Sequence, residues 1–154
     1  MSFDSQRDVC VAFLPLRAQI EYHYQTAKKQ CDKSEPYVAL TLNTMVITPL
    51  KEQCRRIDAV CEEPSSMLTS DHPRGVLDEC INVFNDTIAD PCISHIVFSE
   101  EATNAGRDET TRWLESTKDR FRKRGFAFDE RTLDELLAVR LIPQNIYLLH
   151  ATLG

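Results

Sequence analysis

Apolar side chains recur every three or four residues along most of this chain, the spacing that places them on one face of an α-helix. The first such stripe predicts a long helix from about Ser5 to Cys31. Pro15 falls inside this range, so the helix either kinks there or takes its regular form only from that point. The stripe consists of Val9, Phe13, Leu16, Ile20, Tyr24, Ala27 and Cys31.

The same spacing, together with signals for helix ends, predicts four further helices. Their approximate ranges are 48–63, 71–90, 108–124 and 132–142. Thr48 is suited to cap the first of these, with Pro49 in its first turn. Gly125 is placed to end the third. The last helix begins with Thr132 and Glu135 at the spacing of a capping box, in which each residue bonds a backbone group of the other.

Three apolar stretches are harder to assign, namely 37–47, 93–99 and 145–149. Residues 37–47 form a buried strand or a buried helix, and periodicity does not decide between them. Residues 93–99 are short and β-branched enough for a strand, and 100–107 reads as a loop. We therefore expect a mainly α fold, a single-domain bundle of about five helices over residues 1–154. The alternative is an α+β domain in which 37–47, 93–99 and 145–149 pair in a small sheet.

Composition narrows the range of functions. The chain has only four glycines, which argues against an all-β fold and against a glycine-rich phosphate loop. Its formal net charge is −6, and the stretch 58–101 carries ten acidic residues against one basic residue. Such a surface repels phosphate backbones, so we expect no nucleic acid partner.

We expect a soluble, intracellular protein. The first residues lack the basic start and apolar stretch of a signal peptide, and no apolar run approaches the ~20 residues needed to cross a bilayer. Membrane insertion is therefore not expected.

The cysteines and histidines give no metal or catalytic signature. There are six cysteines, but no two closely spaced Cys and His pairs, so we expect free, mostly buried thiols and neither metal nor cofactor. Cys92 and His95 come nearest to a metal-binding pair. His95 also lies near Ser99, Glu100 and Glu101, which makes this the one cluster to consider for catalysis.

Two sets of residues are candidates for binding a partner. The first lies on the helix over 108–124, where a single tryptophan precedes a dense basic run that surrounds a phenylalanine. Its members are Trp113, Arg120, Phe121, Arg122, Lys123 and Arg124. The second set is acidic and consists of Asp78, Glu79, Asp86 and Asp90.

These observations favour a non-catalytic protein, a helical adaptor or accessory subunit that binds a protein partner through its helix faces. Two alternatives stay open. One is a small thiol-dependent or hydrolytic enzyme that uses Cys92 or the region of His95. The other is an inhibitor or pathogen effector that binds a basic target through the acidic stretch 58–101.

Overall fold

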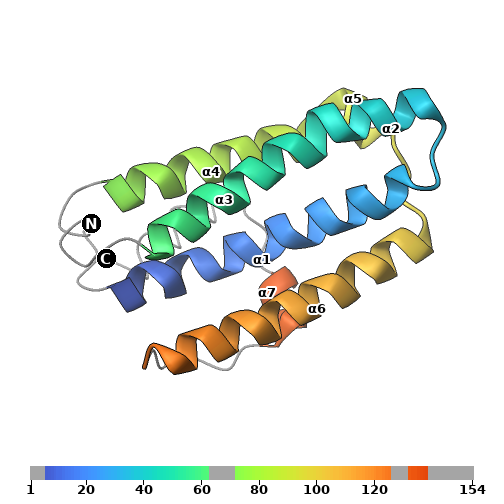
Figure 1. The fold of residues 1–154 in the computed structure, drawn as a ribbon. Coiled ribbons are helices and arrows are strands. Elements are labelled where there is room, and N and C mark those ends of the chain that lie inside the picture. The colour runs from blue at the N-terminus through green and yellow to red at the C-terminus, as the bar shows by residue number, and fades with distance from the viewer. Residues whose placement is uncertain (1–5, 63–71, 126–131, 139–154) are drawn as a thin grey trace.

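The computed structural model describes residues 6–62, 72–125 and 132–138 (Figure 1). In these ranges the chain forms seven α-helices and one π-helical turn, and no strand. The elements are α1 (Gln6–Cys31), α2 (Pro36–Leu42), η1 (Asn43–Ile47), α3 (Thr48–Glu62), α4 (His72–Ala89), α5 (Pro91–Ser94), α6 (Glu100–Lys123) and α7 (Leu133–Ala138). The mainly α fold expected from the sequence is confirmed.

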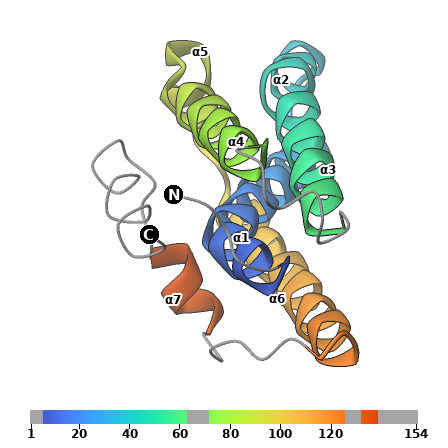
Figure 2. The same cartoon turned by 90° about the vertical axis from the view of Figure 1, so that its left-hand side faces the viewer.

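Helix α1 lies at the centre of the bundle. Helices α2, η1 and α3 follow without a break, and this continuous segment and α4 lie on one side of α1 in Figure 1. Helix α6 lies on the other side. The view along the bundle in Figure 2 shows the same order, with α3 and α4 above α1 and with α6 and the short α7 below it. No helix in the described ranges is both long and apolar enough to span a lipid bilayer.

The main apolar core fills the space between α1, the α2–α3 segment and α4. Its largest fully buried side chains are Phe13, Leu16, Ile20, Leu42, Leu50, Ile57, Leu77, Ile81 and Phe84. The α1 contribution to this list comes from the stripe predicted from the sequence. A second, smaller cluster lies on the opposite side of α1 and joins Leu14 and Ala18 to Leu114 of α6 and Leu136 of α7. Helix α1 is therefore covered on two sides.

The helix predicted to begin at Thr48 is longer than expected. The stretch 37–47 is helical, and α1 likewise continues through Pro15. Thr48 does not act as an N-cap, because its backbone N–H donates to the carbonyl of Asn43 across the π turn. Pro49 has no N–H to donate, and its ring crowds the preceding turn of a regular helix. The wider π turn immediately before it lets the helix continue.

The predictions for residues 93–107 were wrong. Residues 93 and 94 end α5, the following residues pair with no strand, and α6 begins at Glu100 instead of 108. The Ser99 side chain caps α6 by accepting a hydrogen bond of 3.0 Å from the N–H of Ala102. The alternative small sheet is wrong for 37–47 and 93–99, and 145–149 lies outside the described residues.

Small residues bring α6 close to α1. Ala102, Gly106 and Thr110 of α6 are completely or almost completely buried. A side-chain carbon added at Gly106 would overlap the hydroxyl of Thr26 on α1. The first half of α6 is thus fixed on α1 by close backbone approach, and this fixes where its second half lies.

Helix α7 begins as predicted. The hydroxyl of Thr132 accepts a hydrogen bond of 3.2 Å from the N–H of Glu135. This is one half of the expected capping box. The predicted end of this helix lies outside the described residues.

Candidate interaction site

A small pocket opens where the first half of α1, the end of α3 and the second half of α6 meet. Its cavity volume is about 30 Å³, which is above the ~10–15 Å³ that a site needs to hold one ordered water molecule. We call it the basic-aromatic pocket, because arginine and aromatic side chains dominate its lining. The lining residues are Phe13, Leu14, Arg17, Ile57, Asp58, Cys61, Trp113, Thr117, Arg120, Phe121 and Arg124.

Arg17 is the buried charge of this pocket, with 6% of its surface exposed. Its Nε donates to Oδ1 of Asp58 at 3.1 Å, and its Nη2 donates to Oδ2 of Asp58 at 3.4 Å and to Oε1 of Glu21 at 3.2 Å. The remaining nitrogen, Nη1, is buried and has no hydrogen-bond partner among the described residues. A guanidinium group carries five N–H donors. The donors on Nη1 are therefore left unused.

The surroundings keep Arg17 charged. Burial on its own lowers the pKa of the guanidinium group, but the interactions with Cys54, Asp58 and Glu21 together raise it above the ordinary value. The guanidinium carbon also lies 4.7 Å from the centre of the Trp113 ring, a geometry in which the aromatic face attracts a cation. Trp113 thus belongs to the same site as the buried charge.

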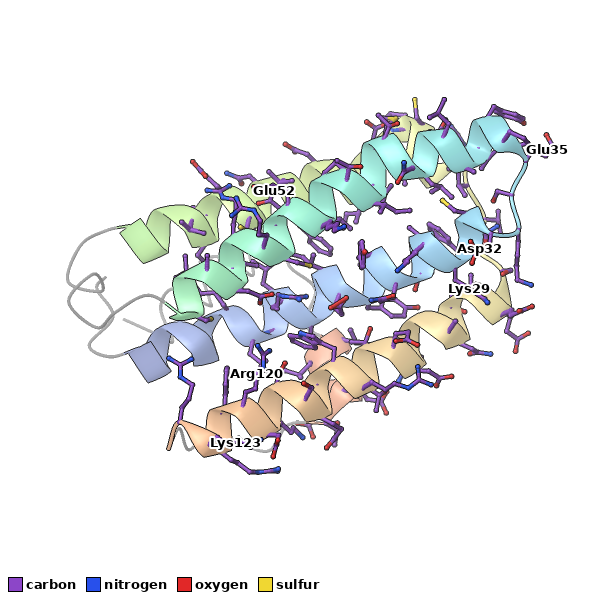
Figure 3. All side chains as sticks on the ribbon, in the orientation of Figure 1. Lys29, Asp32, Glu35, Glu52, Arg120 and Lys123 are labelled. Atoms are coloured by element: carbon purple, nitrogen blue, oxygen red, sulfur yellow. The ribbon has the colours of Figure 1, made fainter. Side chains whose placement is uncertain are left out.

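Two further arginines come from the end of α6. Arg120 is exposed, and its Nη2 donates to the hydroxyl of Thr117 at 3.2 Å. Arg124 donates to the backbone carbonyl of Cys61 at 3.2 Å, which joins the ends of α6 and α3. Figure 3 shows Arg120 between α6 and α1, with Lys123 on the outer side of α6. Residues four apart share a helix face, so Arg120 and Arg124 enter the pocket together.

The structure divides the first predicted set of binding residues. Trp113, Arg120, Phe121 and Arg124 line the pocket, whereas Arg122 and Lys123 do not. Both of the latter are exposed, and Lys123 forms an ion pair with Asp119 one turn earlier.

The predicted acidic set does not meet at this pocket. Asp78, Glu79 and Asp86 lie on α4 and Asp90 follows it. The contacts of Glu79 and Asp90 are structural. Glu79 pairs with Arg56 of α3, and Asp90 caps α5 by accepting a hydrogen bond from the N–H of Cys92 at 2.8 Å.

The cluster considered for catalysis is not assembled. His95 is exposed at the end of α5, Ser99 caps α6, and Glu101 pairs with Lys33. Cys92 is exposed at the start of α5. Among the described residues, none of these side chains forms a hydrogen bond or ion pair with another that would activate a nucleophile. In the described part of the chain, no three Cys, His, Asp or Glu side chains gather to hold a metal ion.

The buried thiols are poor nucleophiles. Burial raises the pKa of Cys54 to about 12 and that of Cys80 to about 11. Because only the thiolate reacts readily, both groups are unreactive near neutral pH.

Sequence reasoning missed Arg17 and Asp58. Arg17 lies next to Leu16 of the predicted apolar stripe, and periodicity treats it as a solvent-facing residue of α1. A signal was available for the α6 part, since residues 113, 117, 120, 121 and 124 are spaced three or four apart and share one face. Nothing in the sequence indicated that this face meets Arg17.

Comparison with known proteins gives no relative. No family model, no curated protein and no solved structure matches the chain.

Proposed function

We propose that this protein is a non-catalytic interaction protein, a helical adaptor or accessory subunit, and that a partner protein binds it at the basic-aromatic pocket. One observation supports the proposal above all. The pocket combines a buried arginine that has unused donors with a tryptophan and with two more arginines at its rim. Arginine and tryptophan are the residue types that most often dominate binding energy at protein interfaces.

The alternatives lack comparable support. A thiol enzyme needs a reactive thiolate, yet burial raises the pKa values of Cys54 and Cys80. In the described part of the chain, no basic side chain forms a hydrogen bond with the exposed Cys92. The acidic effector needs an uncommitted acidic face, yet Glu79 and Asp90 already form contacts within the protein.

The experiment compares two variants that carry the same change in charge. Arg120→Gln with Arg124→Gln removes two positive charges from the pocket. Arg122→Gln with Lys123→Gln, which we call the outer-face variant, removes two from exposed positions of the same helix end that do not line the pocket. Tagged wild-type protein and both variants are purified from native cells, and the co-purifying proteins are quantified. Circular dichroism and urea unfolding establish first that both variants fold.

The proposal predicts a protein that co-purifies with the wild type in a fixed ratio. The pocket variant should recover less of this partner protein, by a factor of about ten or more, because it loses hydrogen-bonded charges at the centre of the interface. The outer-face variant should recover nearly the wild-type amount. Equal recovery by both variants would place the partner elsewhere on the molecule, and recovery of no stoichiometric partner would refute the interaction role itself.

A further inference from the structure

We infer that the group recognised by the basic-aromatic pocket is a carboxylate, carried by an acidic side chain or by the C-terminus of the partner polypeptide. The inference rests on the proposed function, because it names the chemistry by which the partner docks at that same pocket. It follows from the charge of the site, from the unused donors of Arg17 and from the polypeptide nature of the proposed partner.

The pocket is positively charged although the protein is acidic as a whole. Its lining carries the guanidinium groups of Arg17, Arg120 and Arg124 against two carboxylates, that of Asp58 in the lining and that of Glu21, which pairs with Arg17. The whole chain has a formal net charge of −6. A local excess of positive charge in a concave site attracts anions and rejects cations. The ligand group is therefore an anion.

The donors of Arg17 are arranged for a second anionic oxygen. Asp58 and Glu21 occupy Nε and Nη2, which leaves the two N–H groups of Nη1 pointing at no acceptor in the described structure. Buried donors are normally paired. An oxygen of a ligand carboxylate that enters between Arg17 and the arginines of α6 supplies the missing acceptor when the side chains that enclose Nη1 move aside.

The proposed partner is a polypeptide, and an unmodified polypeptide carries its negative charges on carboxylates. A carboxylate has two oxygens, so it can accept from Nη1 of Arg17 and from a guanidinium group of α6 at the same time. Phe13, Trp113 and Phe121 form the apolar part of the lining. They suit the aliphatic carbons that precede a carboxylate.

Trp113 offers a direct assay on the purified protein. It is the only tryptophan in the chain and lies in the pocket, so its indole N–H gives a single NMR signal that reports on this site. The protein is titrated with sodium propionate, with sodium methylphosphonate and with sodium chloride at equal ionic strength. Propionate should shift the indole signal along a saturating curve, with a dissociation constant on the order of 1–10 mM. Methylphosphonate should bind no more tightly than propionate, and chloride should give no saturating shift.

The two paired variants show whether the arginines are responsible. Arg120→Gln with Arg124→Gln should raise the dissociation constant for propionate at least fivefold. Arg122→Gln with Lys123→Gln should leave it within a factor of two. Arg17→Lys, which keeps the charge but removes the fork, should also weaken propionate binding at least fivefold in protein that circular dichroism shows to be folded. No saturation by propionate, tighter binding of methylphosphonate, or equal binding by both paired variants would overturn the inference.

Two larger probes distinguish the sources of the carboxylate. N-acetylglutamic acid α-amide presents a side-chain carboxylate, and N-acetylalanine presents a C-terminal one. The tighter ligand identifies the source, and failure of both overturns the inference.

The result of these titrations is independent of the purification experiment. If propionate binds but no partner co-purifies, the carboxylate site stands and the interaction role fails. If a partner is lost with the pocket arginines but no carboxylate binds, the interaction role stands and the inference fails.

Discussion

Lowering the pH should destabilise this protein through His23. The imidazole lies on α1 beside a cavity of about 200 Å³ whose other walls are Val46, Thr87, Ile88, Ile93, Ile96 and Phe98. None of these residues carries a charge. The rings of Tyr22 and Phe84 each lie 5.3 Å from the His23 ring, measured between centroids. Burial in these surroundings lowers the pKa of His23 to about 4, because an apolar environment disfavours the charged imidazolium.

The sign follows from which state binds the proton first. In the unfolded chain His23 has a pKa near 6.5, so the unfolded state is protonated at a pH where the folded state is not. The contribution of the neutral imidazole to stability is complete above pH 6.5 and is lost as the pH falls toward 4. The difference between these two pKa values corresponds to about 3 kcal/mol. Since the ring is partly exposed, we expect a loss of about 2–3 kcal/mol.

Urea unfolding of the wild type and of His23→Gln, at pH values from 7 to 4, measures this loss. Glutamine keeps a polar side chain of similar size but does not titrate. The free energy of unfolding of the wild type should fall by about 2–3 kcal/mol more than that of the variant over this range. Other titrating groups cancel in the difference. Parallel profiles for the two proteins would refute the reasoning, as would an NMR titration that places the pKa of His23 near 6.5.

Three further predictions test the packing of α6, its cap and the thiols. Gly106→Ala should lower the free energy of unfolding, measured with urea, by about 1–3 kcal/mol, because the added carbon overlaps the Thr26 hydroxyl. The same stability as the wild type would mean that α1 and α6 separate easily. Ser99→Ala should cost about 1 kcal/mol through loss of the N-cap, and a thermal melt unchanged from the wild type would show that the cap contributes nothing. In the folded protein at pH 8, iodoacetamide should modify Cys92 at least tenfold faster than Cys54, as followed by peptide mass spectrometry, since burial raises the pKa of Cys54 to about 12. Equal rates for the two thiols would contradict this burial.

Periodicity predicted the helices that bury long apolar side chains. Helix α1, the second half of the α2–α3 segment and α4 each place such residues in the main core. The stretch 37–47 was undecided, because a continuous apolar run fits either a strand or a buried helix. The structure settles it as a helix that joins α3 through the π turn before Pro49.

The first half of α6 could not be found in this way. It packs through Ala102, Gly106 and Thr110, which are small and do not form an apolar stripe. Their burial depends on the close approach to Thr26, a contact between residues about eighty positions apart in the chain. A sequence pattern describes the faces of one helix, whereas close packing depends on two. The sequence pattern therefore predicts a loop over residues 100–107, where the structure has the start of α6.

For the same reason, only the α6 part of the candidate site could be predicted from the sequence. Arg120 and Arg124 share a helix face with Trp113, and this spacing is visible in the sequence. Their partner in the pocket is Arg17, which comes from α1 and is oriented by Asp58 of α3. Three helices have to be placed before the pocket exists. No pattern within a single helix contains that information.

The central position of α1 explains why a charged pocket forms in this fold. A helix surrounded on several sides is normally apolar around most of its circumference. In α1, however, the buried residues include Arg17, Gln19, Glu21 and Thr26. A buried polar group costs free energy unless it is hydrogen-bonded. Asp58 and Glu21 offset most of that cost for Arg17, but Nη1 is left without a described acceptor. A partner carboxylate that binds as proposed gains the hydrogen bonds that folding left unmade, so the buried donor that costs stability in the free protein provides affinity at the pocket.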